Sequence, residues 1–184
     1  MDVLCSVDVA AVRAEPSDDA ERVSELLQGE PVAVEERRDG WARILTVYDY
    51  PGWVREEQIG GVDGDPVEQA RRYLGTPYLW GGMTERGIDC SGLVHMSYRW
   101  LGRLVPRDAD QQEAAGAEVA ENDLRPGDLI TYGDESGSDR ATHIAFWLGD
   151  GRILHSTERD RVNGVVEEVE PNQLRALRRR LIRL

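Results

Sequence analysis

Short runs of apolar and β-branched residues, separated by turn residues, occupy the first third of the chain. Gly, Pro, Asp and Ser punctuate these runs, which cover residues 5–12, 21–27, 31–36, 41–47 and 52–54. Runs of this length with regular turn signals are typical of strands in a small barrel. The pattern therefore predicts an all-β barrel as a first domain over residues 1–60.

The pattern changes to a helical one after the barrel. Asp65 suits a helix N-cap, Pro66 suits the first helical position and Gly75 suits the end of the helix. The linker before this helix, residues 60–64, is short. We therefore expect the barrel to be held against a second domain over residues 61–184.

A second helix is predicted from the apolar spacing of residues 93–101, with Cys90 in its first turn. At a helix N-terminus the unpaired amides and the helix dipole favour a thiolate, which lowers the pKa of the thiol. Cys90 is therefore a candidate nucleophile, and the alternative is a small buried hydrophobic residue. Cys5 is expected in a buried strand, because two distant cysteines form no disulfide framework.

Two apolar runs on either side of Gly149, Asp150 and Gly151 predict a β-hairpin with His143 on one strand and His155 on the other. These histidines are twelve positions apart, so they share a face only if the loop has an odd number of residues or a bulge shifts the register. A two-residue loop would place them on opposite faces. On a shared face, His143 could deprotonate Cys90 while His155 orients His143.

Four motifs follow one another in the order known from the NlpC/P60 cysteine peptidases, which cut peptidoglycan peptides. They are Gly-Thr-Pro-Tyr-Leu-Trp-Gly-Gly at 75–82, Gly-Ile-Asp-Cys-Ser-Gly-Leu-Val at 87–94, Arg-Pro-Gly-Asp-Leu-Ile at 125–130 and the histidine hairpin at 143–155. On these motifs the chain resembles that family over about residues 66–157. The resemblance implies an α+β, papain-like fold, in which the helix that carries the cysteine packs on an antiparallel sheet that carries both histidines.

The same resemblance implies catalytic roles. Cys90, His143 and His155 would form the triad, and the Tyr78 hydroxyl would lie near the oxyanion and the substrate. The alternative for Tyr78 is an aromatic core residue. Trp80, in the same motif, is expected in the core.

Substrate binding is expected next to the nucleophile. In relatives that act on free peptides, the residues matching Asp89 and Ser91 bind the terminal ammonium of the substrate, although N-capping alone would explain Asp89. Many family members carry serine where this chain has Ala109. Recognition of the amino end would therefore be weaker here or supplied from elsewhere.

The first domain is an obvious source of such contacts. It resembles a bacterial SH3 domain, a module that often precedes NlpC/P60 domains, on residues 12–17, 27–30, 39–43 and 52–54. The candidate residues that it offers for binding the substrate are Glu15, Tyr48 and Tyr50.

The net charge of −13 argues against nucleic acid as a partner, because phosphate binding needs a basic surface. The exception is the arginine-rich tail at residues 174–184, which we expect to form a terminal helix docked on the core. A membrane-surface or nucleic-acid role is the alternative for this tail. We expect a monomer without a membrane span, metal or other cofactor.

The resemblance implies a cysteine endopeptidase that hydrolyses the γ-D-glutamyl to diamino acid bond of murein peptides with a free N-terminal L-Ala, in cell-wall recycling. Residues 1–8 lack the basic and apolar regions of a signal peptide, so a cytoplasmic location is expected. The alternatives are a secreted hydrolase of the intact wall and a catalytically silent module that binds wall peptides.

Overall fold

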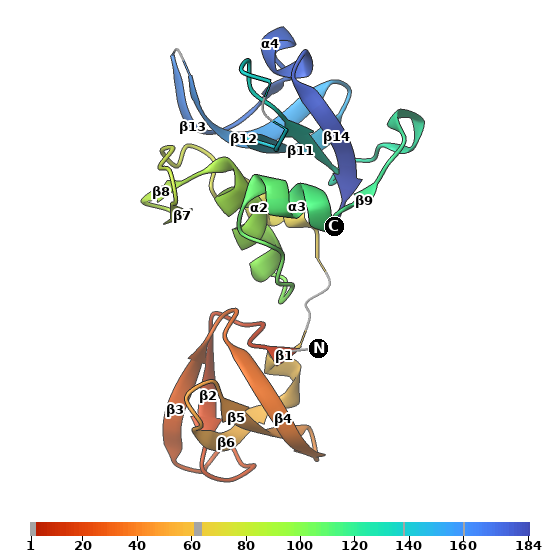
Figure 1. Cartoon of the computed structure of the whole chain (residues 1–184). Helices are drawn as coiled ribbons and strands as arrows, with labels where there is room; N and C mark the ends of the chain where they lie inside the picture. The colour runs from red at the N-terminus through yellow and green to blue at the C-terminus, as the bar shows by residue number, and fades with distance from the viewer. Residues whose placement is uncertain (1–2, 61–63, 138, 160) are drawn as a thin grey trace. The chain divides into compact units, whose positions relative to one another are not determined.

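The computed structural model describes residues 3–60, 64–137, 139–159 and 161–184. Contacts divide the chain into two compact units, shown in Figure 1. One consists of residues 1–64 with Arg99–Arg103, and the other of Asp65–Tyr98 with Leu104–Leu184. Residues 1 and 2, at the start of the chain, and linker residues 61–63 fall outside the described residues, so the expectations that involve them stay predictions.

The first unit is an antiparallel sheet in the order β1-β4-β5-β6-β2-β3. Its strands are β1 (Val3–Leu4), β2 (Val9–Arg13), β3 (Arg22–Leu27), β4 (Pro31–Arg38), β5 (Trp41–Thr46) and β6 (Pro51–Arg55), followed by the short 3-10 helix η1 (Glu56–Gln58). Each predicted apolar run contributes a strand. The β4–β5 turn has Asp39 and Gly40 at positive φ, as a two-residue hairpin requires.

The core of this unit comes from the inward side of each strand. It includes Ala10, Val12, Leu26, Ile44 and Val54, with Cys5 beside them. Cys5 is fully buried and free, as expected, but it forms an isolated bridge with Ile59 outside the named strands.

The second unit is built on an antiparallel sheet in the order β13-β12-β11-β10-β14-β9. Its strands are β9 (Ala117–Glu118), β10 (Leu129–Tyr132), β11 (His143–Gly149), β12 (Arg152–Arg159), β13 (Val162–Val169) and β14 (Arg178–Arg183). Its helices are α1 (Pro66–Arg71), α2 (Cys90–Arg99), α3 (Ala109–Ala115), η2 (Glu121–Asp123) and α4 (Asn172–Arg175), and a small hairpin joins β7 (Met83–Thr84) to β8 (Gly87–Ile88). The α+β class, with the cysteine at the start of a helix beside an antiparallel sheet, is confirmed.

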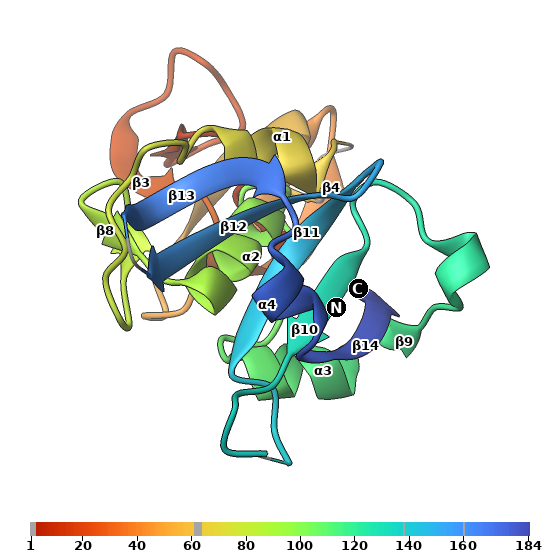
Figure 2. The same ribbon diagram turned by 90° about the horizontal axis from the view of Figure 1, so that it is seen from above.

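Alternating side chains give this sheet two packed faces. Figures 1 and 2 show α2 and α3 on one side of the sheet and α4 on the other. On the α2 side, the rings of Tyr98 and Phe146 stack with their centroids 6.4 Å apart. The opposite face buries Ile130, Tyr132, Ala145 and Ile153 against Leu174, Leu177 and Leu181. Full burial of one such aliphatic side chain contributes about 1.5–3 kcal/mol, so the sheet is held from both faces.

Helix α1 begins as the sequence predicts. Asp65 is the N-cap, and its Oδ1 accepts a hydrogen bond of 2.8 Å from the backbone amide of Val67, with Pro66 in the first position. The regular helix ends at Arg71, and turns continue to Gly75, which has a φ of +81°. The start was predicted correctly, and the end lies earlier than expected.

The arginine-rich tail is a strand, so the predicted terminal helix is wrong. Only α4 is helical, and β14 pairs with both β10 and β9. Leu174, Leu177 and Leu181 have helical spacing, but all three reach the same side of the sheet because the chain turns from α4 into β14. The tail was also expected to dock on the core, and the structure shows that it does.

Buried carboxylates account for much of the positive charge of this tail. Arg178 forms two hydrogen bonds of 2.7 and 2.6 Å with Glu170, whose side chain is 2% exposed. Arg183 does the same with the buried Asp128, at 2.6 and 2.7 Å. Among the described residues, no helix has both the length and the apolar character needed to cross a bilayer.

These ion pairs predict unequal effects of removing two arginines from one strand. Arg178→Leu removes both guanidinium hydrogen bonds of the buried Glu170 carboxylate and leaves it, among the described residues, only the long 4.0 Å ion pair with Arg175, so the free energy of unfolding should fall by about 3 kcal/mol. Arg180→Leu, on the same strand but exposed, should change it by less than about 0.5 kcal/mol. Urea denaturation measures both. Equal effects of the two variants would contradict the structural role of the Arg178 pair.

Candidate active site

The N-terminus of α2 is built around the carboxylate of Asp89. Its Oδ1 accepts a hydrogen bond of 2.7 Å from the amide of Gly92, and its backbone carbonyl accepts one of 2.9 Å from Leu93. This is the geometry of an N-cap, which satisfies amides that lack partners in the first helical turn. Asp89 thus fixes the position of Cys90, the next residue.

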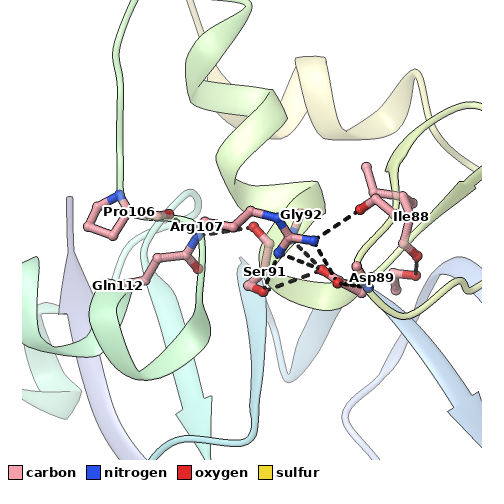
Figure 3. A network of polar contacts seen from close by, with 10 residues as sticks. Ile88, Asp89, Ser91, Gly92, Pro106, Arg107 and Gln112 are labelled. Carbon is pink, nitrogen blue, oxygen red and sulfur yellow. Dashed lines mark hydrogen bonds and ion pairs between the residues drawn. The ribbon is translucent and has the colours of Figure 1, made fainter.

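Arg107 neutralises this carboxylate (Figure 3). Its Nη1 donates to Oδ1 of Asp89 at 3.0 Å and its Nη2 donates to Oδ2 at 2.7 Å. Oδ2 also accepts from the amide of Gly81 at 2.7 Å. Ser91 Oγ donates to Oδ1 of Asp89 at 3.3 Å and accepts from Arg107 at 2.9 Å. Nη1 and Nη2 of Arg107 therefore hold both carboxylate oxygens and the serine in one cluster.

This cluster affects the expected substrate contacts. Each Asp89 oxygen already accepts at least two hydrogen bonds, and a carboxylate offers about four acceptor sites in total. Asp89 and Ser91 are both about 6% exposed. Both residues therefore support the helix terminus. Both also line the pocket in front of Cys90, and their expected binding of the substrate ammonium stays a prediction.

A tight turn beside this cluster brings Trp80 to the surface. Gly82 donates a hydrogen bond of 2.8 Å to the carbonyl of Leu79, and Gly81 has a φ of +76°. A Cβ on Gly82 would collide with the carbonyl oxygen of Gly87, so only glycine fits there. Trp80 is 82% exposed, and the prediction that it lies in the core is wrong: the turn points its side chain outward.

A pocket of about 610 Å³ opens in front of the cysteine. Its lining includes Trp80, Cys90, Arg107, Asp108, Asp110 and Arg140. Ala109, where many relatives carry serine, also lines the pocket and is buried at the start of α3. The pocket therefore combines one nucleophilic atom with charged groups of both signs.

The hairpin brings His143 and His155 together through a bulge. The loop has two residues, Asp150 and Gly151, which alone would place the histidines on opposite faces. The register shifts between Trp147 and Gly149, and this extra residue restores the shared face. Nε2 of His143 lies 2.8 Å from Nδ1 of His155. Of the three arrangements that the sequence leaves open, the hairpin adopts the one with a bulge.

Burial controls the protonation of the nucleophile and its neighbour. Burial, followed by the charge of Asp89, raises the pKa of Cys90 to about 11, although amides of Ile144, Ser91 and Cys90 itself favour the thiolate. Burial and the neighbouring His155 lower the pKa of His143 to about 3. The expected lowering of the thiol pKa by the helix terminus is therefore reversed, and the resting pair is a neutral thiol and a neutral imidazole.

Among the described residues, no direct hydrogen bond joins Cys90 to His143. The amide that reaches the sulfur belongs to Ile144, which follows His143 on β11. Nucleophile and base are often more widely spaced in ligand-free sites than in complexes with substrate.

Tyr78 lies close enough to Cys90 for their charges to interact. Burial and then the thiolate form of Cys90 raise the pKa of Tyr78 to about 12, so its hydroxyl carries a proton at neutral pH. Its backbone amide donates to Oδ1 of Asn163 at 2.9 Å, which anchors the motif to β13. The hydroxyl is thus placed as an uncharged donor near the nucleophile, and its role at the oxyanion stays a prediction.

Glu168 was not identified from the sequence. Its Oε1 lies 2.9 Å from Nε2 of His155, so the polar chain from His143 has a third member. Glu168 lies on β13 opposite Ile153, and only the register of β12 with β13 brings it to His155. Arg107, Asp110 and Arg140 were also missed as site residues.

The other candidate residues belong to the first unit or lie further along α2. Glu15, Tyr48 and Tyr50 are exposed on the first unit, and their part in substrate binding stays a prediction. His95 is a partly buried residue whose Nδ1 lies 2.8 Å from the carbonyl of Val105. Within the described ranges, no group of three or more His, Cys, Asp or Glu residues could hold a metal ion.

The raised pKa of the thiol predicts how alkylation of Cys90 depends on pH. The rate constant with iodoacetamide should rise by about tenfold per unit between about pH 6 and pH 9, because the thiolate fraction does so well below a pKa of about 11. Mass spectrometry of the peptides separates Cys90 from the fully buried Cys5. A rate constant that is already constant from pH 6 upward would mean a thiolate at rest and would contradict the prediction.

Comparison with known proteins adds to this geometry. Residues 75–179 match the NlpC/P60 family profile, and residues 12–59 match the profile of the bacterial dipeptidyl-peptidase Sh3 domain. The gamma-D-glutamyl-L-lysine dipeptidyl-peptidase of Bacillus subtilis is 31% identical over 152 residues, which are 78% of this chain and 51% of that protein. The chain therefore spans about half the length of this relative.

Solved structures show the same fold. An NlpC/P60 family protein from Bacillus cereus aligns with a TM-score of 0.61 at 24% identity, over 99% of this chain and 62% of that one. RipD from Mycobacterium tuberculosis, described as a non-catalytic NlpC/p60 domain protein adapted to peptidoglycan binding, aligns with a TM-score of 0.52 at 24% identity, over 66% of this chain and 99% of that one. The profile match covers more than half of the chain and includes Cys90, His143 and His155. The chain belongs to the NlpC/P60 family and carries a bacterial SH3 domain at its N-terminal side.

Proposed function

We propose that this protein is a cysteine endopeptidase that hydrolyses the γ-D-glutamyl to diamino acid bond of murein peptides with a free N-terminal L-Ala. The observation that carries the proposal is Cys90, which lines a pocket at the start of α2 next to the strand that bears the paired histidines. The peptidase named for the γ-D-glutamyl-L-lysine bond in Bacillus subtilis supports the choice of substrate.

The first step is attack of the sulfur on the substrate carbonyl carbon. Because the thiol and the imidazole are both neutral at rest, His143 takes the thiol proton as the carbon–sulfur bond forms. Backbone amides at the start of α2 and the Tyr78 hydroxyl donate hydrogen bonds to the developing oxyanion. These donors are fixed before the reaction, so little reorganisation is needed when the charge appears.

The second half of the reaction releases the two products. Protonated His143 gives its proton to the leaving amine of the diamino acid, and the peptide bond breaks to leave a thioester on Cys90. Water then attacks the thioester with His143 as the base, which regenerates the thiol and releases the γ-D-glutamyl product. His155 orients His143 through the 2.8 Å contact in both halves.

The free amino end of the substrate can bind a carboxylate that has fewer partners than Asp89. Asp108 and Asp110 line the pocket. Oδ1 of Asp110 accepts a hydrogen bond of 2.9 Å from the amide of Gln111, and its Oδ2 forms a long ion pair of 3.8 Å with Arg140. An ammonium group bound to Asp110 would form a charge-assisted hydrogen bond, which contributes about 1.5–3 kcal/mol. We assign the recognition of L-Ala to Asp110. Action on released fragments in recycling, and a cytoplasmic location, stay predictions.

A catalytically silent module that binds wall peptides is the second candidate. Two observations favour it: the neutral thiol, and the lack of a direct hydrogen bond between Cys90 and His143 in the part of the chain that the structure describes. RipD shows that this fold can be non-catalytic. Hydrolysis of a murein peptide by the purified protein separates the two functions.

Substitutions of the triad give the direct test. Cys90→Ala should abolish hydrolysis of L-Ala-γ-D-Glu-diaminopimelate, and His143→Ala should be almost as damaging because the two residues act as a unit. His155→Asn should keep part of the rate, since its amide oxygen can still accept a hydrogen bond from His143. Chromatographic assay of the released diamino acid measures all three. Hydrolysis by the Cys90→Ala protein would refute the mechanism.

Discrimination by the amino end tests the substrate. The same peptide amide-linked to muramic acid has no ammonium, so its kcat/KM should be at least about tenfold lower, which corresponds to about 1.4 kcal/mol. Asp110→Asn should reduce the ratio of kcat/KM on the free peptide to kcat/KM on the linked peptide. Asp123 is an exposed carboxylate outside the pocket, so Asp123→Asn should leave this ratio unchanged. Equal kcat/KM values on the free and linked peptides would favour a hydrolase of the intact wall.

A further inference from the structure

Glu168 extends the histidine pair by one contact. Its Oε1 lies 2.9 Å from Nε2 of His155, whose Nδ1 lies 2.8 Å from Nε2 of His143. The side chain of His155 is fully buried, and that of Glu168 is 24% exposed. The peptidase mechanism above requires only the two histidines and leaves this carboxylate without a role.

A histidine in the third position of the triad leaves the direction of its hydrogen bond open. Two neutral imidazoles can share one hydrogen bond in either direction. If His155 donates from Nδ1, then Nε2 of His143 accepts, and the single proton of His143 lies on Nδ1. Only Nδ1 remains for the thiol, because Nε2 is occupied by His155. In this state His143 cannot act as a base.

The opposite direction produces an active base. If His155 accepts at Nδ1, His143 donates from Nε2 and its Nδ1 has a lone pair for the thiol proton. The two states differ only in where the protons lie. Some group outside the pair must therefore select between them.

We propose, on the basis of the peptidase function above, that Glu168 is the positioning residue that selects the active state. An ionised carboxylate only accepts hydrogen bonds, so Nε2 of a neutral His155 must carry the proton of that ring. Its Nδ1 then accepts from His143, and the order of donors is fixed from the thiol to the carboxylate. Glu168 touches neither the substrate nor the reacting atoms.

Arg159 holds the carboxylate in this role. Its Nη2 donates to both oxygens of Glu168. The hydrogen bond from His155, together with Arg159, lowers the pKa of Glu168, so the group is ionised at neutral pH. The charge of Arg159 also lowers the pKa of His143, so the carboxylate balances a cation near the base.

The neighbouring residue provides a matched control. Glu167 precedes Glu168 on β13 and lies opposite Leu154, so its side chain points to the other face of the sheet. It forms ion pairs with Arg71 at 2.6 Å and with Arg152 at 3.8 Å. Replacing Glu167 removes the same charge from the same strand without touching the histidines.

The experiment compares Glu168→Leu, Glu168→Gln and Glu167→Leu in the full chain. Nitrogen-15 chemical shifts of the imidazoles report the tautomers without any substrate, and kcat and KM are measured on L-Ala-γ-D-Glu-diaminopimelate. Glu168→Leu should mix the tautomers and lower kcat at least about tenfold with little change in KM, as for other residues that orient a catalytic histidine. Glu168→Gln keeps an acceptor and should retain the tautomers and most of kcat, and Glu167→Leu should match the unmodified protein.

Several outcomes would overturn the role of Glu168. A folded Glu168→Leu protein with unchanged tautomers would do so, as would a loss of kcat in Glu167→Leu equal to that in Glu168→Leu. If Glu168→Leu does not fold, the spectrum of the unmodified protein decides alone, because both histidines should carry their protons on Nε2. An unmodified protein that cuts no murein peptide refutes the peptidase function, while the tautomers still decide the role of Glu168.

Discussion

The carboxylate of Asp89 is the interaction on which the site depends. It joins the amide of Gly92 at the start of α2, the amide of Gly81 in the turn that carries Trp80, and the guanidinium of Arg107 before α3. Gln112 of α3 adds a second tie, because its Nε2 donates to the carbonyl oxygens of Ser91 and Pro106 (Figure 3). Without the carboxylate, the partly buried guanidinium of Arg107 and two amides would lose their partner, and the nucleophile would lose its fixed position.

The same arrangement occurs twice around the proposed chemistry. Asp89 with Arg107 supports the thiol, and Glu168 with Arg159 supports the imidazole pair. In each case the arginine balances a carboxylate that is at least partly buried, with the side chain of Asp89 8% and that of Glu168 24% exposed, so neither acid is left as an uncompensated charge. At rest the Cys90 thiol and the His143 imidazole are both uncharged. Charge appears on these two groups only while a substrate reacts. The electrostatics thus favour a concerted proton transfer over a preformed ion pair.

Local signals in the sequence predicted much of this fold. The strands of the first unit, the Asp65 cap and the cysteine at a helix start follow from residues near one another in the chain. The predictions for the tail and for Trp80 were wrong for the same reason. Apolar character shows that a side chain prefers burial, but strand pairing and turns decide where it lies. Leu181 found a strand partner in β10, and the turn at Gly81 brought Trp80 outward.

The predicted site was incomplete for a different reason. Glu168 meets His155 only through the register of two strands, and Asp89 meets Arg107 across eighteen residues, so neither contact has a local signature. The direction of the thiol pKa shift was also missed, because the sequence shows a helix terminus but not the depth of burial. The order of the motifs was enough to predict the nucleophile and the base, but not the charged residues that fix their positions.

Because of the bulge in the β11–β12 hairpin, the two histidines share a face of the sheet only when the number of residues between them is odd or even in the right sense. Because successive side chains of a strand alternate between faces, adding or deleting one residue between His143 and His155 turns one ring to the other side of the sheet, while a change of two restores the pair. As residues are added to or deleted from this hairpin one at a time, the histidines are therefore alternately paired and separated. A library of such variants would alternate between paired and separated histidines even where every member folds.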